Sequence, residues 1–164
     1  MQILDLEDLF QQLLRYRDRT SDITSLGPWL QKQIEPCCFP CLNHIPFVAD
    51  TYTRNWIARE SPEQSGFEAL IMRWDQQVKT TIHGHPAFSF YHVISGVFEM
   101  ELFCRNEQEH LQVKETQTLY PSDTTWCWGE SDRYDNFIHR VTCLEAGYTF
   151  HIYSDDAQKG LCLS

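Results

Sequence analysis

Three histidines have the types and the spacing of a metal site. His83 and His85 stand one residue apart in the segment Ile82-His83-Gly84-His85, and His139 follows a loop rich in Gly, Asp and Ser. Side chains at positions i and i+2 of a β-strand point to the same face, so both imidazoles of the pair can reach one ion if that face lines a barrel. The pair alone also fits two polar residues on one strand face, and the third histidine favours a metal site.

The residues around the first two histidines resemble the first sequence motif of the cupins. Between His85 and Gly96 lie three residues, a variable position and six further residues. His139 corresponds to the histidine of the second cupin motif. The variable position often carries a Glu ligand in cupins, and in this chain it is Ser89. The resemblance implies a jelly-roll β-barrel that holds one metal ion.

A site of three neutral imidazoles leaves the full charge of a divalent metal ion unneutralised. Such an ion attracts anionic ligands, and a thiolate is a suitable one. Imidazole donors also suit Zn, Cu and Ni, so the ligand set does not by itself select iron.

Among the cupins, the chain resembles the cysteine dioxygenases and related thiol dioxygenases from about residue 52 to residue 155. The likeness rests on four motifs in the order and approximate spacing of that family. They are Tyr52-Thr53-Arg54-Asn55, Ile82-His83-Gly84-His85, His139-Arg140-Val141 and Thr149-Phe150-His151-Ile152-Tyr153-Ser154.

The resemblance implies a role for each motif. Arg54 would bind the carboxylate of the substrate, with Tyr52 in the same substrate site, and a guanidinium suits a carboxylate. An ordinary surface or ion-paired arginine is the alternative. Thr149, His151 and Tyr153 share one strand face and would form a catalytic relay that ends at a Tyr hydroxyl beside the metal. A buried Tyr and His that only satisfy one another are the alternative here.

The activity implied is that of a non-haem Fe(II) dioxygenase that uses O2 to oxidise cysteine, or a related small thiol, to its sulfinic acid. The same chemistry on 3-mercaptopropionate, cysteamine or a larger thiol is a first alternative. A cupin that binds a metal or small ligand without turnover is a second. A zinc-dependent hydrolase or isomerase is weaker still, because the sequence offers no obvious general base.

Three positions depart from the family pattern. Some members cross-link a Cys to the relay Tyr, and Ser89 occupies the matching position, so this chain cannot form that bond there. Asp155 replaces the Pro of the family, and Gly84 stands where Asp is common. These departures leave the local geometry and the choice of thiol open.

The elements that must position these residues are mainly strands. Leucines and Phe10 recur with helical spacing from Leu4 to Leu14, and a second short helix is predicted from Trp29 to Ile34 after the Gly27-Pro28 pair. Trp126 and Trp128 are predicted to pack in the core. Short runs of aromatic and β-branched residues predict strands at 52–58, 67–74, 80–85, 88–94, 97–105, 111–116, 118–120, 126–128, 137–144 and 148–153.

We therefore expect one mainly β domain over residues 1–164. A helical flank at 1–45 would cover a β-barrel core at 52–156, and the many close strands indicate a sandwich or barrel. The resemblance makes this a cupin jelly roll and favours a monomer.

The composition indicates an acidic, folded chain. Of the 164 residues, 42% are hydrophobic, as in ordinary globular domains, and the formal net charge of -10 argues against a nucleic-acid or anionic membrane partner. Residues 1–8 lack the basic start and apolar run of a signal peptide. Seven cysteines are an odd number, which predicts free thiols in the reducing cytoplasm.

A compact cluster of Cys37, Cys38, Cys41 and His44 is a second candidate for a metal site. Structural zinc sites usually take further ligands from another segment, and the prolines within this cluster favour a packed loop. We expect no zinc site there.

Overall fold

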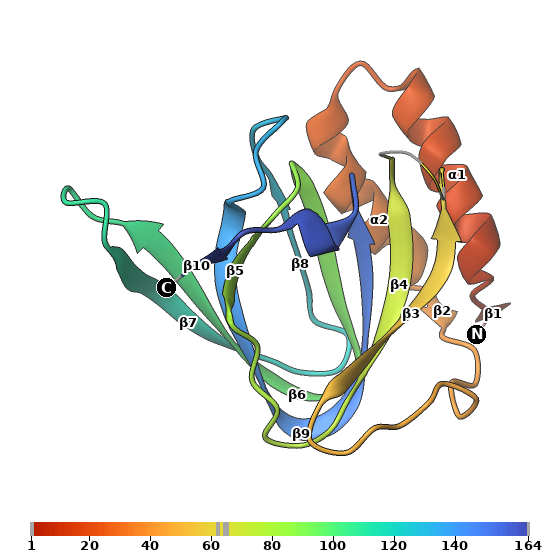
Figure 1. Ribbon diagram of the computed structural model, residues 1–164. Coiled ribbons are helices and arrows are strands. Elements are labelled where there is room, and N and C mark those ends of the chain that lie inside the picture. The colour runs from red at the N-terminus through yellow and green to blue at the C-terminus, as the bar shows by residue number, and fades with distance from the viewer. Residues whose placement is uncertain (1, 62, 64–65, 164) are drawn as a thin grey trace.

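Two layers of antiparallel strands share two long, bent strands (Figure 1). The computed structural model describes residues 2–61, 63 and 66–163. The strands are β1 (Gln2–Ile3), β2 (Cys37–Cys38), β3 (Tyr52–Arg59), β4 (Glu68–Trp74), β5 (Ile82–His85), β6 (Phe88–Arg105), β7 (Leu111–Leu119), β8 (Thr124–Trp128), β9 (Asn136–Tyr153) and β10 (Cys162–Leu163). The prediction of a mainly β chain is confirmed.

Strands β6 and β9 run through both layers and pair with each other along most of their length. The first half of β6 and the second half of β9 form one layer with β3, β4 and β8. Their other halves form the second layer with β5, β7 and β10. β1 and β2 form a separate parallel pair.

The bend between the layers is at two glycines. Gly96 has a φ of 87°, a left-handed conformation that favours Gly. A Cβ on Gly147 would collide with the carbonyl of Ser95 on the facing strand. The prediction of a turn that ends one strand at Ser95-Gly96 was wrong, because β6 continues as a bulge paired with β9. The predicted breaks within β7 and β9 were wrong for the same reason, since continuous ladders bridge them.

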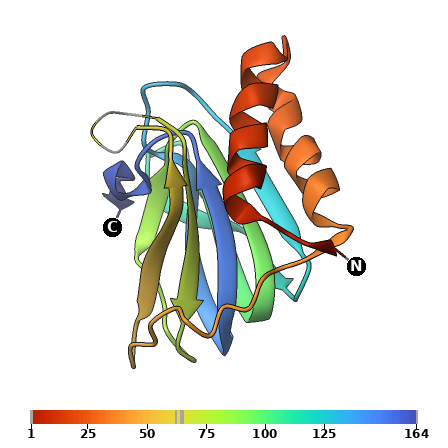
Figure 2. The same cartoon turned by 90° about the vertical axis from the view of Figure 1, so that its right-hand side faces the viewer.

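Helix α1 (Leu6–Arg19) lies on the outer face of the β3–β4–β9–β6–β8 layer (Figure 2). Its N-terminus is capped, since the Asp8 backbone N–H donates to the Asp5 side chain at 3.0 Å. The apolar residues recognised in the sequence form its buried face, among them Phe10 and Leu13. The predicted amphipathic helix is therefore observed.

Helix α2 (Leu26–Ile34) begins earlier than predicted. Gly27 and Pro28 lie in its first turn, where backbone N–H groups have no partner within the helix, so Pro28 does not break it. A Cβ on Gly27 would collide with the ring of Trp126 on β8. Gly27 thus lets the helix approach the sheet closely, and Trp126 and Trp128 pack in this outer core as predicted. No helix in the described residues is long and apolar enough to cross a membrane.

Side chains at alternate positions of β9 face two different sides of the layer. Phe150 and Ile152 are fully buried in the outer core, between the layer and the helices. Thr149, His151 and Tyr153 occupy the alternate positions and point into the barrel. The outer core therefore fixes the strand whose other face carries polar residues.

His92 on β6 faces outward, and we expect it to make the fold acid-sensitive. It is 6% exposed, and burial lowers its pKa to about 4. An unfolded His titrates near pH 6.5, so between about pH 6.5 and 4 only the unfolded state binds this proton, and the free energy of unfolding falls as the pH drops through that window.

Urea unfolding at pH 7.5 and 4.5 checks this prediction. The wild-type chain should lose about 2 kcal/mol more than His92→Gln between the two values. Equal losses in the two proteins would show that His92 does not carry the effect.

Candidate metal centre

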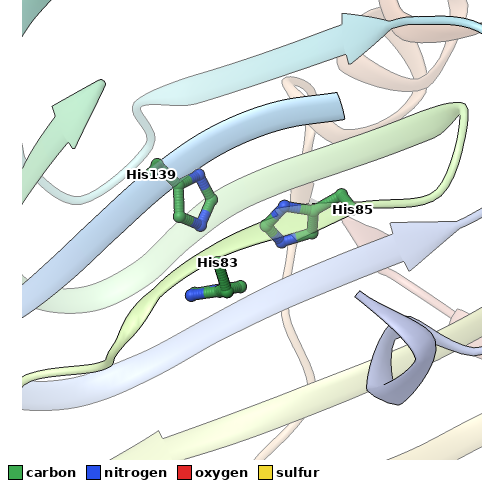
Figure 3. Close-up of side chains that lie close together, drawn as sticks. All are labelled: His83, His85 and His139. Carbon is green, nitrogen blue, oxygen red and sulfur yellow. The ribbon is translucent and has the colours of Figure 1, made fainter. Parts of the chain in front are cut away.

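The three histidines predicted from the sequence meet inside the barrel (Figure 3). β5 carries His83 and His85, and β9 carries His139, which pairs directly with His83 across the two strands. One nitrogen atom from each ring lies within 4.8 Å of the other two. The rings face a common space, so they could hold one metal ion.

The hydrogen bonds of the rings leave them ready to bind a metal. Nδ1 of His83 lies 2.8 Å from the Thr81 carbonyl, and Nδ1 of His85 lies 3.3 Å from the Phe137 carbonyl. A carbonyl only accepts, so in both rings Nδ1 donates and Nε2 keeps a free lone pair. Nδ1 of His139 is buried and has no hydrogen-bond partner in the described residues. Burial lowers the pKa of all three, which keeps them in the neutral, metal-binding form.

A cavity of about 40 Å³ lies beside these rings and is lined also by Tyr52, Arg54 and Tyr153. The ring of Tyr52 packs on Trp74, with centroids 4.5 Å apart. Of the residues predicted for the site, all but Thr149 line the cavity, and Thr149 lies directly behind His151. The volume suits only a small molecule.

Arg54 brings an unpaired positive charge to the cavity. Its Nε is buried without a hydrogen-bond partner, and the described residues offer its guanidinium no ion pair. The residue as a whole is half-buried, and an anionic ligand would give its buried Nε a partner. The ordinary ion-paired arginine considered from the sequence is not what the described residues form.

The predicted relay is present as a row of short contacts. Thr149 Oγ1 lies 2.7 Å from His151 Nε2, and His151 Nδ1 lies 2.9 Å from the Tyr153 hydroxyl. Burial lowers the pKa of His151 to about 3, so its imidazole is neutral. Burial also raises the pKa of Tyr153 above its usual value, so its hydroxyl keeps its hydrogen. The ring of Tyr153 stacks on His85 at 5.4 Å, which places the relay beside the three histidines.

Two relay neighbours were missed in the sequence. The Trp74 indole donates to Thr149 Oγ1 at 2.8 Å, and Tyr91 lines the same cavity with its ring 4.7 Å from His151. They come from β4 and β6, which flank β9. Their inward position follows from strand pairing, and no local motif signals it.

The departures from the family pattern now have structural counterparts. Ser89 pairs directly with Tyr153 across β6 and β9, and its buried hydroxyl has no hydrogen-bond partner in the described residues. A Cβ on Gly84 would collide with the backbone at Tyr134, so no larger residue fits there without a shift of that loop. Asp155 accepts a hydrogen bond from the Tyr134 hydroxyl at 2.6 Å, a contact that Pro could not make.

In the described residues, the side chains of Cys37, Cys38, Cys41 and His44 do not lie close enough together to share an ion. In the described residues, the three histidines are the one group of three or more His, Cys, Asp or Glu side chains close enough to share an ion. Cys37, Cys38 and Cys41 are free thiols.

Comparison with solved structures identifies the fold. No family model matches the sequence, and no curated protein sequence matches it. The cupin domain of Cnp3 from Schizosaccharomyces pombe is 9% identical, and the match covers 73% of this chain and 74% of that chain with a TM-score of 0.52. A cupin 2 domain-containing protein from Halorhodospira halophila is 14% identical, with 74% and 76% covered and a TM-score of 0.52.

At such low identity the likeness shows the fold and not the activity. The specific likeness to cysteine dioxygenases stays a prediction from the motifs. The prediction of a jelly roll is confirmed, and the chain has the cupin fold with a three-histidine cluster that could hold a metal ion.

Proposed function

We propose that this chain is a non-haem Fe(II) thiol dioxygenase that converts cysteine, or a closely related small carboxylate thiol, to its sulfinic acid with O2. The observation that carries the proposal is the single small cavity shared by three neutral histidines and the unpaired guanidinium of Arg54. A molecule with a metal-binding group and a carboxylate a few bonds apart suits that pairing. The small volume disfavours bulky thiols.

The residues that line the cavity have different roles in the proposed reaction. Bound by these residues, Fe(II) would supply a position for the thiolate and would activate dioxygen. The three histidines hold the ion without neutralising its charge, which favours a thiolate. Arg54 binds and orients the carboxylate. Tyr153, whose hydroxyl lies 2.9 Å from His151 Nδ1, would present this hydroxyl to the bound substrate or oxygen. Both atoms of O2 pass to sulfur, so the thiol supplies all four electrons and no other reductant is needed.

The direct test is anaerobic reconstitution with Fe(II), addition of L-cysteine and mass spectrometry after oxygen is admitted. The proposal expects cysteine sulfinate. Product with 3-mercaptopropionate but not cysteine would keep the chemistry and move the substrate. If no thiol in a panel gave a sulfinic acid, the result would favour the alternative, a cupin that binds a metal without turnover.

Arg54→Gln is expected to lower kcat/KM for cysteine by about 10- to 100-fold, because it removes charge-assisted hydrogen bonds worth about 1.5–3 kcal/mol. Most of the loss should appear in KM. Turnover of cysteamine, which has no carboxylate, should change little. Oxygen-consumption rates with both thiols check this.

Arg15→Gln is the matched control, because the Arg15 side chain is 57% exposed and far along the chain from the site. It should leave both substrates unaffected. If the wild-type protein oxidised cysteine and cysteamine equally well, Arg54 would not be the carboxylate-binding residue.

A further inference from the structure

The residues that follow β9 contribute a wall of the metal cavity. Residues 155–163, here called the closing segment, leave β9 after Tyr153 and return to β5, where β10 pairs with the strand of the two histidines (Figure 1). Of the described residues that line the cavity, all but Thr80 and Ala157 lie on strands of the barrel. Ala157 also packs against the inner core that contains Tyr153. The closing segment therefore reaches the cavity through Ala157.

A buried carboxylate holds Ala157 in this wall. Glu68 on β4 pairs directly with Tyr153 on β9, so both side chains lie on the inner face of the layer. Glu68 is 1% exposed, and its Oε1 accepts the backbone N–H of Ala157 at 3.0 Å. Its Oε2 accepts from the Trp56 indole at 3.0 Å and from Arg59 at 3.2 Å. One oxygen of this carboxylate thus holds β3, and the other holds the closing segment.

The far end of the closing segment is fixed on β5. The backbone N–H of Gly84 donates to the Leu161 carbonyl at 2.9 Å, and the N–H of Leu161 donates to the Tyr134 carbonyl at 3.0 Å. A Cβ on Gly160 would collide with the Gly84 carbonyl, so the two backbones touch there. These contacts anchor the segment beyond Ala157, and the hydrogen bond at Ala157 itself fixes how closely the wall approaches the cavity.

The position of this wall matters because both ends of the proposed ligand are bound elsewhere. A mercaptocarboxylate would place its thiolate at the metal and its carboxylate at Arg54. The cavity between them is about 40 Å³, so each added methylene must bulge out of the line between the two bound ends and meet a wall. Ala157 offers only a methyl group to the wall. Substitutions there change the space without removing a group that binds the ligand.

We propose that Ala157 is a specificity-determining residue that limits the length of the thiol, and that Glu68 is the positioning residue that holds Ala157 in place. The inference rests on the proposed function and deepens it. It names the substrate class as mercaptocarboxylates with no more than two carbon atoms between the sulfur and the carboxylate. The wall and its hydrogen bond to Glu68 are properties of the folded chain, so they can be tested without turnover.

Thiol binding to the Co(II)-loaded full chain under nitrogen tests the wall. A thiolate bound to Co(II) gives a charge-transfer band, and titration with 3-mercaptopropionate and 4-mercaptobutanoate gives a dissociation constant for each. The longer thiol should bind the wild-type protein about tenfold more weakly, as expected for one methylene that a pocket excludes. Ala157→Gly should reduce this ratio to about two- to threefold, and Ala157→Leu should weaken both thiols by more than about tenfold.

Gln158→Leu is the matched control for the wall, because Gln158 follows Ala157 in the closing segment and is exposed. It adds an apolar side chain to the same segment and should leave the ratio of the two dissociation constants unchanged. Equal affinities for the two thiols in the wild-type protein would overturn the inference. The same ratio in the wild-type protein and in Ala157→Gly would also overturn it.

Glu68→Gln tests the positioning role. Its amide has one oxygen, so it cannot accept from both Ala157 and the donors of β3. Hydrogen exchange of the Ala157 amide, followed by NMR in the metal-free full chain, should become about tenfold faster. In the Co(II) protein the ratio for the two thiols should fall toward that of Ala157→Gly, a change in selectivity that a loss of stability alone does not produce.

Glu60→Gln is the control for a lost carboxylate, because Glu60 pairs with Arg17 of helix α1 outside the barrel. It should change neither the exchange of the Ala157 amide nor the ratio for the two thiols. Unchanged exchange and an unchanged ratio in Glu68→Gln would remove Glu68 from the proposal. The Ala157 variants test the wall even if Glu68→Gln does not fold.

Turnover separates this inference from the proposed function. If the Fe(II) protein forms cysteine sulfinate but thiol length selectivity does not depend on residue 157, the inference fails and the dioxygenase function stands. If the ratio in the Co(II) protein shifts as expected but no thiol is oxidised with Fe(II) and O2, the dioxygenase proposal fails and the role of Ala157 in thiol binding stands.

Discussion

His139→Ala is expected to abolish product formation and to weaken metal binding by more than about 100-fold, since the loss of even an indirect partner of a metal ligand costs about 10–100-fold. The variant removes one of three imidazoles and leaves His83 and His85 on a single strand. Two neutral ligands cannot hold the ion at the proposed position. Metal content after Fe(II) reconstitution and desalting, with sulfinate measured in the same samples, checks both effects.

The matched control is His110→Ala, because His110 is exposed and lies outside the cavity. It should retain both metal and turnover. Thermal unfolding of the metal-free proteins should accompany the assay, since alanine at a site only 4% exposed also leaves a hole in the barrel. A folded His139→Ala protein that keeps its metal and its activity would rule out the three-histidine centre.

Tyr153→Phe is expected to lower kcat by about 100-fold or more while metal binding is retained, as for the loss of a group that assists proton or hydrogen-bond transfer. The ring can keep its stacking on His85, with centroids 5.4 Å apart, so only the hydroxyl at the end of the relay is lost. The effect should fall on kcat because Arg54 and the histidines still bind the substrate. Steady-state oxygen consumption and metal analysis on the same preparation measure it.

Tyr120→Phe controls for the loss of a hydroxyl, since Tyr120 is 56% exposed. It should behave as the wild-type protein. If Tyr153→Phe left both thiol oxidation and thiol binding unaltered, the mechanism proposed for Tyr153 would be wrong. Thiol binding without oxidation in the wild-type protein itself would identify a binding cupin.

The sequence predicts the fold best where the residue pattern of one helix or one strand holds over the whole element. The leucine spacing near the N-terminus predicted α1, and aromatic and β-branched runs located every strand from β3 to β9. Errors arose at element ends and at glycines. Ser95-Gly96 has the composition of a turn, yet pairing with β9 carries β6 through it as a bulge. Gly27-Pro28 has the composition of a breaker, yet both residues fit the first turn of α2.

In the candidate site, too, the sequence predicted what depends on a local period and missed what depends on the pairing of distant strands. Two sets of site residues each lie on one face of one strand. His83 and His85 form the first set, and Thr149, His151 and Tyr153 form the second, so the two-residue period of a strand suffices to group the members of each set. Trp74 and Tyr91 could not be predicted, because their strands β4 and β6 are separated from β9 in the sequence and joined to it only by pairing. The unpaired state of Arg54 likewise depends on which side chains surround it in space.

The sequence by itself thus determined the mainly β class and which site residues share a strand face, because these depend on residue type and on local periodicity. The resemblance to known motifs supplied the expected cupin fold and the expected roles of the three histidines and the relay residues. The tertiary structure decided that the rings of β5 and β9 meet, that Arg54 lacks a carboxylate partner among the described residues, and that Trp74 and Tyr91 lie beside the relay. The physical reason is that strand register and burial are set by long-range pairing and packing, which also fix the hydrogen-bond partners and pKa shifts of the site.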